Sequence, residues 1–345
     1  MDKKLLAGLA LLLAAACTND MPYTLKDAGN KLIMNALMNN EEHSHAVILS
    51  LSRTGTTEDV TGEAKVTFSV NGEPAVEAWE GGPGGILRSY WGAPRTFEFI
   101  AAFAPGDKVT VTATALGMKA TSTVTLLTPP AVVSVDTLSV NDGAVEWLTF
   151  AVQMEDKTPG TDYYSLEIHC RYRADYYDGE EFLGSDEGDY YCPGDFTGDL
   201  ILSEDGVVAG EMDDLGLFDF GPVNTYGAFL DNQFDCGKAV LKPRVNKYSL
   251  RPYLWGATIN GKTATRAVVY PEATVKVSHI PVRHYYYLKA LNSLGGGMSD
   301  LSLEEIAIPD NVDGGIGFVG LANTVSSSFS LKSYELNFGE TYYTE

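Results

Sequence analysis

Short segments in which apolar and polar residues alternate recur along this chain, and a period of two predicts β-strands. Asn71-Gly72 follows one such segment and is typical of a tight hairpin turn. Strands this short, at regular spacing, predict an immunoglobulin-like β-sandwich over residues 24–128. The segments that carry the pattern in this part of the chain are residues 47–51, 66–70, 97–99, 109–115 and 120–126.

The prolines of Thr128-Pro129-Pro130 interrupt the pattern, because consecutive prolines cannot continue a hydrogen-bonded ladder. Residues 129–345 are therefore predicted to form a second, larger and mostly-β domain. Its strand-like segments are residues 132–135, 148–154, 164–172, 239–241, 266–270, 274–280 and 318–343. The fold class expected from the whole chain is all-β.

One short helix is expected in the second domain. Pro281 can open a helix over residues 284–294, and Gly295-Gly296-Gly297 ends it. The adjacent tyrosines at 285–287 point to different sides of such a helix, which predicts that sheet or loop covers most of it. Residues 31–38 fit either a helix or a strand.

The beginning of the chain has the features of a secretory signal. Lys3-Lys4 precedes the apolar run Leu5–Ala16, which is shorter than the roughly 20 residues that span a bilayer. Small residues directly before Cys17 are typical of a bacterial lipoprotein signal, so residues 1–16 are expected to be removed and Cys17 to carry lipid. Residues 17–23 would then be a short tether. The alternative is an ordinary cleaved signal with a cysteine beside it by chance.

The charge balance restricts the partners. Asp and Glu number 46 against 24 Lys and Arg, which gives a formal net charge of −22. Nucleic acid and anionic membrane surfaces would repel such a chain, so a nucleic-acid partner is not expected. A solvated protein outside the cytoplasm fits this balance.

The three cysteines after Cys17 allow at most one internal disulfide. Cys170 lies on the apolar side of an alternating segment, which predicts a buried thiol. Cys192 and Cys236 lie in polar, turn-rich sequence and are the candidate pair.

An acidic stretch, residues 175–219, contains 15 Asp or Glu and no Lys or Arg, and is expected to be a loop. Asp186, Asp189, Asp195 and Asp199 are candidate Ca²⁺ ligands, since calcium prefers carboxylate and carbonyl oxygens. The alternative is a solvated loop without metal, and no other cofactor is expected. Tyr176, Tyr177, Tyr190 and Tyr191 interrupt the acidic run and are candidate ligand contacts.

No catalytic motif identifies an enzyme. Gly315, Gly317 and Gly320 match a dinucleotide-binding spacing, but the following residues read as strand rather than helix, so a tight turn or close sheet contact is the better interpretation. A carboxylate-based glycoside hydrolase remains an alternative, because the many acidic residues allow pairs that spacing alone cannot select. The His279 side chain is expected to be partly buried and hydrogen-bonded.

Five segments together resemble landmarks of a Bacteroidota lipoprotein family called domain of unknown function 4249. They are Asn35-Ala36-Leu37 before Ser50–Arg53; the threonine-rich hairpin into Pro129-Pro130; Phe229-Leu230-Asp231 before Phe234 and Gly237-Lys238; Tyr286–Leu291; and Asn311–Phe318. The resemblance implies an outer-membrane lipoprotein, often encoded beside a TonB-dependent transporter, without established catalytic residues. Cys236 departs from the family, where a glycine-like turn residue is expected.

The leading hypothesis is a lipid-anchored outer-membrane accessory or ligand-binding protein that works with a TonB-dependent nutrient importer. The alternative is a surface adhesion or structural lipoprotein. The sequence names neither the ligand nor the face of the membrane, cell surface or periplasm, on which the protein lies.

Overall fold

The computed structural model describes residues 30–53, 56–58, 60–81, 95–142, 145–156, 159–191, 200–201, 207, 226–246, 254, 257–295 and 308–338. Within these ranges the chain is built from β-sheets and one α-helix of 14 residues, which confirms the all-β prediction. None of the described helices is long and apolar enough to cross a membrane.

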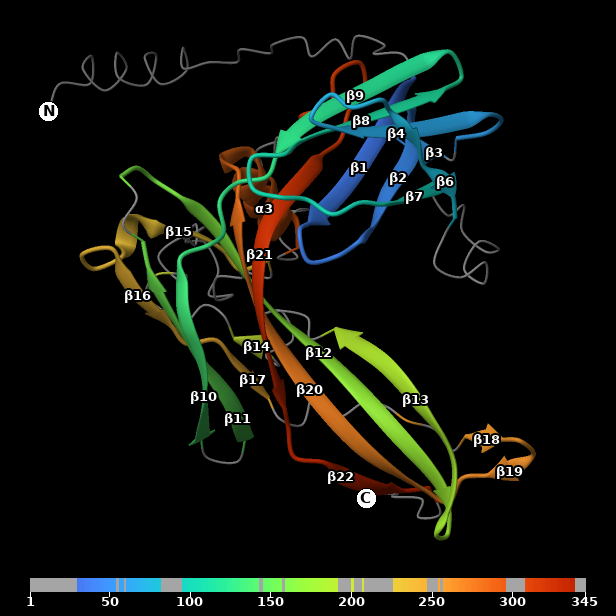
Figure 1. Cartoon of the computed structure of the whole chain (residues 1–345), viewed down its shortest axis with the longest axis vertical. Helices are drawn as coiled ribbons and strands as arrows, with labels where there is room; N and C mark the ends of the chain where they lie inside the picture. Colours follow the sequence, from blue (N-terminus) through green and yellow to red (C-terminus); the bar gives the residue numbers. More distant parts are fainter. Residues whose placement is uncertain are drawn as a thin grey trace, which may run out of the picture.

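Two facing sheets form a β-sandwich in the N-terminal part (Figure 1). The first sheet contains β1 (Lys31–Asn39), β2 (Ser44–Arg53), β3 (Thr56–Glu58), β6 (Trp79–Glu80) and β7 (Arg95–Ile100). The second contains β4 (Ala64–Val70), β5 (Val76–Glu77), β8 (Lys108–Ala115) and β9 (Met118–Thr125). The segment that fitted either helix or strand is thus strand β1, because it pairs on both sides. The immunoglobulin-like strand arrangement stays a prediction.

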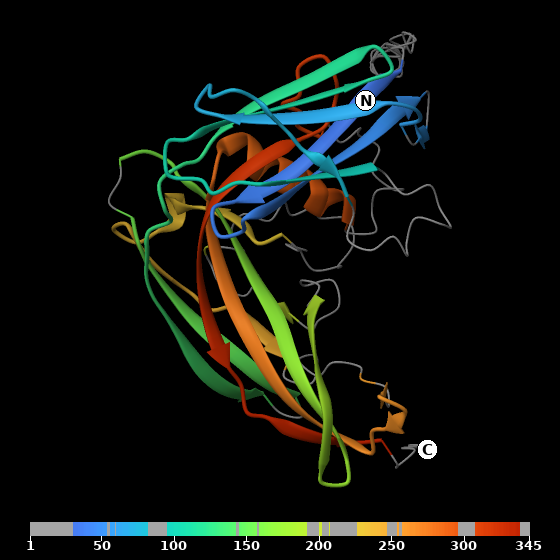
Figure 2. The same ribbon diagram turned by 45° about the vertical axis from the view of Figure 1, so that its right-hand side comes forward.

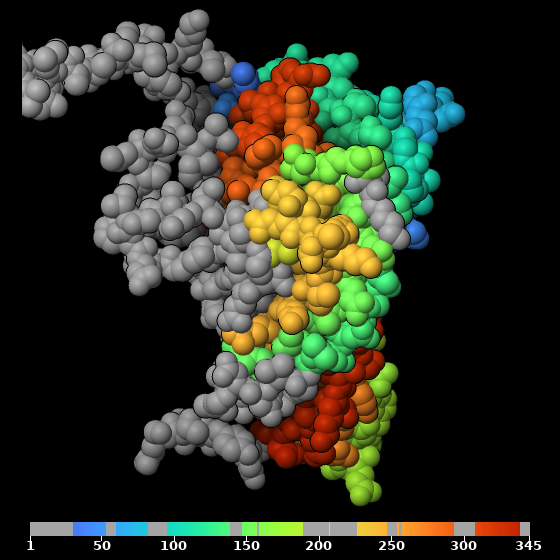
Figure 3. Space-filling model, turned by 90° about the vertical axis from the view of Figure 1, so that its left-hand side faces the viewer, coloured from blue at the N-terminus to red at the C-terminus, as the bar shows by residue number. Residues whose placement is uncertain are grey.

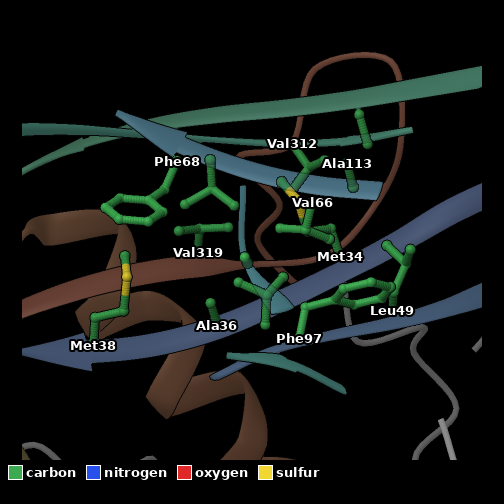
Figure 4. Packing of buried hydrophobic residues seen from close by; sticks show 14 of the residues in the cluster. Met34, Ala36, Met38, Leu49, Val66, Phe68, Phe97, Ala113, Val312 and Val319 are labelled. Atoms are coloured by element: carbon green, nitrogen blue, oxygen red, sulfur yellow. The ribbon is translucent and has the colours of Figure 1, made fainter. Parts of the chain in front are cut away.

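The apolar positions of the alternating pattern fill the space between these two sheets (Figure 4). Phe68 of β4 stacks on Phe99 of β7 with ring centroids 4.1 Å apart, and Phe97 is also buried. The predicted turn at Asn71-Gly72 has left-handed backbone at both residues, with φ of 54° and 77°. Local pattern and tertiary packing therefore agree in this part of the chain.

A strand from the end of the chain joins the sandwich to the rest of the protein. The free edge of β1 pairs in parallel with β21 (Val319–Ser330), which makes the first sheet part of an 11-stranded sheet. Eight of its strands follow the order β13 (Glu181–Tyr191), β12 (Tyr163–Asp178), β20 (Arg266–Ile280), β21, β1, β2, β7 and β6, and the other three pair beside this path. The division into domains at residues 128–129 stays a prediction, and one sheet runs through both parts.

The strands β12 and β20 run side by side from helix α3 (Val282–Gly295) to the far end of the molecule (Figures 1 and 2). β13 (Glu181–Tyr191) pairs with β12 along its length. The prediction of a loop over 175–219 is therefore wrong for residues 175–178 and 181–191, where pairing between β12 and β13 overrides the polar composition, and for the short strand at residues 200–201. The acidic side chains sit on an edge strand, where charge opposes pairing with other chains.

Pro271 lies in the middle of β20, although proline cannot donate to a ladder. The neighbour of β20 changes at this point: β21 pairs as far as Glu272, and β22 (Tyr334–Asn337) pairs from Val269 onward. The missing amide therefore falls in the gap between two partner strands. The strand can therefore continue past Pro271, and the two predicted strands, 266–270 and 274–280, form the single strand β20.

A separate sheet packs against β12 and β20 and buries Phe150, Tyr164, Cys170 and Phe229 between the layers. It contains β10 (Val132–Asp142), β11 (Val145–Glu155), β14 (Leu200–Ile201), β16 (Lys238–Leu241) and β17 (Arg244–Asn246), while β15 (Ala228–Leu230) pairs with β12. β18 (Thr258–Ile259) and β19 (Lys262–Thr263) form a small hairpin. The segment with β15 and β16, gold in Figure 3, lies at the surface of the face shown there.

Helix α3 (Val282–Gly295) follows Pro281, as predicted. Tyr285 is buried, and Tyr287 stacks on Phe318 with centroids 4.2 Å apart. Tyr286 is 54% exposed, so the cover that was expected over most of the helix does not extend to this residue. Successive residues are about 100° apart around a helix, so the three tyrosines cover about 200° and the sheet cannot bury all of them.

The glycines of the nucleotide-like spacing are contact positions, as the sequence analysis favoured. A Cβ atom at Gly315 would lie 2.7 Å from the carbonyl oxygen of Leu32, and one at Gly317 would lie 2.4 Å from that of Met34. Gly317 also has φ of +119°. Gly315 and Gly317 therefore approach β1 too closely to carry a side chain.

Candidate functional site

A cavity of about 300 Å³ lies where the sandwich meets the long strands. We call it the junction pocket. Its described lining comes from β1, β12, β20, β21 and α3, together with Glu42 and Tyr226. The strands are neighbours in the 11-stranded sheet, so β-pairing itself brings these segments together. The described lining residues are Leu37, Met38, Asn39, Glu42, Ser165, Leu166, Glu167, Ile168, His169, Tyr226, Lys276, Ser278, His284, Leu288, Ala322 and Thr324.

Strand register places the polar groups of the pocket opposite one another. The even-numbered residues of β12 face the core, so the odd-numbered Ser165, Glu167 and His169 project from the other face of the sheet. In the pairing with β20, Glu167 is opposite Lys276 and Ser165 is opposite Ser278. The pocket therefore combines charged and hydroxyl groups with apolar surface.

The charged groups of the pocket are unequally paired. The Lys276 ammonium lies 3.9 Å from the Glu42 carboxylate. Desolvation raises the pKa of Glu167 above its ordinary value, and the nearby charge of Lys276 partly opposes this shift. Glu167 is nevertheless an exposed residue, so its side chain meets solvent at the pocket.

His284 supplies a neutral wall. Its side chain is 6% exposed, and burial lowers its pKa to about 4, so the imidazole is uncharged at neutral pH. The ring lies against Phe318 with centroids 5.3 Å apart. A Cβ atom at residue 320 would lie 2.9 Å from His284 Cε1, so glycine at Gly320 provides the space for this ring. Among the described residues, Nδ1 of His284 has no hydrogen-bond partner.

Three aspartates form a second cluster on the other side of β12. Carboxylate oxygens of Asp156, Asp162 and Asp231 lie within 4.8 Å of one another. The Tyr164 hydroxyl donates a hydrogen bond to Asp156, and the Asp162 amide donates to Asp231 Oδ1 at 3.0 Å. Burial, with smaller contributions from the other two carboxylates, raises the pKa of Asp231. Three oxygens in this arrangement are ligands of the type that Ca²⁺ accepts.

Side-chain and backbone contacts hold this aspartate cluster in place. His279 Nδ1 lies 2.9 Å from the carbonyl oxygen of Thr128, and its Nε2 lies 3.5 Å from Asp162 Oδ1. This confirms a buried, hydrogen-bonded His279. Gly237 packs so closely that a Cβ atom there would lie 2.2 Å from the carbonyl oxygen of Asp156.

Comparison with known proteins identifies the family. A family model described as "Domain of unknown function (DUF4249)" matches residues 18–328. The chain belongs to the DUF4249 family. The search of curated proteins found no match. Among solved structures, a DUF4785 family protein from Legionella pneumophila is similar at 10% identity and a TM-score of 0.21, with 72% of this chain and 52% of that chain covered. This chain thus spans about half the length of that structure.

Two landmark asparagines of this DUF4249 protein stabilise the strand crossing. Asn35 Oδ1 accepts a hydrogen bond from the Phe318 amide at 2.9 Å. Asn311 donates to the carbonyl of Val319 at 2.7 Å and accepts from its amide at 2.8 Å. Asn35 therefore ties the start of β21 to β1, and Asn311 ties the preceding segment to β21.

The candidate tyrosines of this DUF4249 protein are not one surface. Tyr176 is only 4% exposed and belongs to a core cluster, so the prediction that it contacts ligand is wrong; its side of β12 faces inward. Tyr177 is half-buried beneath the Arg266 guanidinium, whose carbon lies 4.3 Å from the ring centroid. Tyr190 and Tyr191 lie on β13, and their side chains are outside the described residues.

The candidate calcium ligands are only partly described. Asp186 is exposed on β13 opposite Ala174, and Asp189 is opposite Arg171 on the same strand. Asp195 and Asp199 lie outside the described residues. A calcium site made by these four residues stays a prediction for this DUF4249 protein.

The cysteines of this DUF4249 protein have separate outcomes. Cys170 is buried, as predicted. Cys236 is exposed, with φ of 52°, so the glycine-like position expected in the family indeed has left-handed backbone. Cys17 and Cys192 lie outside the described residues, and both the lipid attachment and the disulfide Cys192–Cys236 stay predictions.

Sequence reasoning missed the junction pocket and the aspartate cluster. The local signal was that Glu167 lies between Leu166 and Ile168, and Lys276 between two valines. Their partnership depends on the register of β12 against β20, which the sequence does not state. Asp156 and Asp231 are far apart in sequence and meet only through packing around Tyr164.

Proposed function

We propose that this protein is a lipid-anchored, ligand-binding accessory subunit of an outer-membrane importer of the TonB-dependent class. The observation that carries the binding role is the junction pocket. A concave site with apolar walls and a few convergent polar groups has the composition of small-molecule sites. A volume of about 300 Å³ fits a compact nutrient.

The predicted lipid anchor at Cys17 supports the outer-membrane location in this proposal. The signal-like residues 1–16 end at Cys17, and acyl chains on that cysteine would hold the protein on the membrane. The resemblance that led to the DUF4249 family also implies an outer-membrane lipoprotein beside a TonB-dependent transporter. Binding, rather than turnover, is the role proposed for the pocket.

Co-purification tests the proposal. The tagged full-length protein would be isolated from its native membrane in mild detergent, and co-purifying proteins and small molecules identified by mass spectrometry. We expect a TonB-dependent barrel near one-to-one stoichiometry. Recovery of the lipoprotein alone, in a detergent that preserves other barrel complexes, would refute the importer role.

A matched pair of variants separates ligand capture from barrel binding. Leu37→Trp enlarges a pocket-lining side chain that is 54% exposed, whereas Ile100→Trp makes the same change at a residue of β7 that is 67% exposed and does not line the pocket. Both variants should retain the barrel. Only Leu37→Trp should lose the small molecule, and equal retention of it by both variants would exclude the pocket as the binding site.

A further inference from the structure

The fixed charges of the junction pocket leave one carboxylate without a close partner. Among the described residues, Glu42, Glu167 and Lys276 are the acidic and basic groups other than histidine that line it. Lys276 pairs with Glu42 at 3.9 Å. Glu167 has no ion pair or hydrogen bond with the described residues, although Lys276 is its neighbour across the strands. The three described charges of the pocket therefore sum to one negative charge, with Lys276 shared between the two carboxylates.

Glu167 is an exposed residue that lines the cavity, so a ligand can reach its carboxylate and a cation placed there would form an ion pair. The other walls do not oppose a cation. The Ser278 and Thr324 hydroxyls bond to each other at 2.8 Å, and the His284 imidazole is buried beside Phe318. Leu288 and Ala322 supply apolar surface on the same cavity.

The size of the cavity limits the cation. A volume of about 300 Å³ equals that of about ten water molecules at about 30 Å³ each. A ligand of about ten non-hydrogen atoms therefore fits.

We propose that the junction pocket binds a small organic ammonium compound, with its ammonium group against Glu167 and its apolar body against Leu288, Ala322 and Leu37. This inference rests on the proposed ligand-binding function and names the ligand class of the same pocket. The ammonium donates hydrogen bonds to the carboxylate, and the charge of the ion pair makes these bonds stronger than neutral ones.

Calorimetric titration of the full-length protein in mild detergent tests the proposal with three probes of matched size. Phenethylamine is cationic, 2-phenylethanol is its neutral counterpart, and 3-phenylpropionate is anionic. We expect phenethylamine to bind at least about tenfold more tightly than the alcohol, and the anion to bind most weakly. Amine affinity equal to or below that of the alcohol, absence of amine binding at millimolar concentration, or preference for the anion would each overturn the proposal.

Variants test the role of Glu167. Glu167→Gln keeps the shape of the side chain and should lower phenethylamine affinity about tenfold while leaving the alcohol affinity unchanged. Glu73→Gln, at an exposed turn of the sandwich, is the matched control and should change neither affinity. Unchanged amine affinity in a Glu167→Gln protein that retains its thermal midpoint would overturn the assignment. Failure of this titration leaves barrel co-purification unaffected, so the two proposals fail separately.

Discussion

Gly227 lies directly before β15, with φ of +56°, and a Cβ atom there would be 2.0 Å from the carbonyl oxygen of Leu166 on β12. Gly179, in the turn between β12 and β13, has nearly the same φ of +58°, but a Cβ atom there would meet nothing within 4 Å. Alanine at the two positions therefore meets the same backbone strain. Only alanine at 227 also collides with the backbone of a central strand.

The structure sets the size of the difference. Left-handed backbone costs an alanine about 1–2 kcal/mol, and the smaller unfolded-state entropy of alanine returns about 0.4–1 kcal/mol, so Gly179→Ala should destabilise by about 1 kcal/mol. Gly227→Ala must in addition displace the segment whose carbonyl accepts the Leu166 amide at 3.0 Å. Losing that bond and loosening the contact between β12 and β15 should add at least about 2 kcal/mol.

Urea unfolding followed by intrinsic fluorescence measures the difference. With a slope of about 3 kcal/mol per molar urea, an added 2 kcal/mol lowers the midpoint of Gly227→Ala by about 0.7 M relative to Gly179→Ala. The wild-type protein provides the reference for both. Midpoints of the two variants within about 0.2 M of each other would refute the close approach of Gly227 to β12.

Three further predictions concern titrating and buried polar groups. The pKa of His284 falls to about 4 on folding, so between this value and pH 6.5 the unfolded chain binds a proton that the folded chain excludes. Stability is therefore full above pH 6.5 and decreases as the pH falls toward 4. His284→Gln should flatten this part of a plot of thermal midpoint against pH. Tyr164→Phe removes the hydrogen bond to the buried Asp156 and should cost about 1–3 kcal/mol in chemical unfolding, whereas Tyr177→Phe at a half-buried ring should cost less than about 1 kcal/mol. Burial raises the pKa of Asp231, so the stability that the protonated carboxyl contributes is lost as the pH rises through this raised pKa. Asp231→Asn should therefore raise the thermal midpoint at pH 8 but not at pH 3. Equal effects at the two pH values would contradict this.

Local patterns in the sequence were sufficient to predict most elements of the fold. Alternation at 66–70 and 109–115 is confirmed as β4 and β8, and Pro281 with the glycines after residue 294 marks the ends of α3. These signals work because side-chain period and proline or glycine backbone restrictions act within a few residues. The same reasoning correctly assigned Gly315 and Gly317 to close backbone contact.

Long-range pairing decided the features that local patterns could not. The parallel pairing of β1 with β21 joins residues about 280 positions apart, makes the sheet continuous and brings β1 to the junction pocket. Pairing with β12 also turned residues 181–191 from a predicted loop into strand β13 and placed Tyr176 inside the core.

The sequence by itself therefore determined which residues form strands and the all-β fold class. Its landmark segments also indicated the family to which the chain belongs. Only the tertiary structure decided which strands are neighbours, and hence that Glu167, Lys276 and His284 line one cavity. It likewise decided that Asp156, Asp162 and Asp231 form one cluster. The physical reason is that a strand's period depends on its own side chains, whereas its partner and register depend on which distant surfaces bury the most apolar area together.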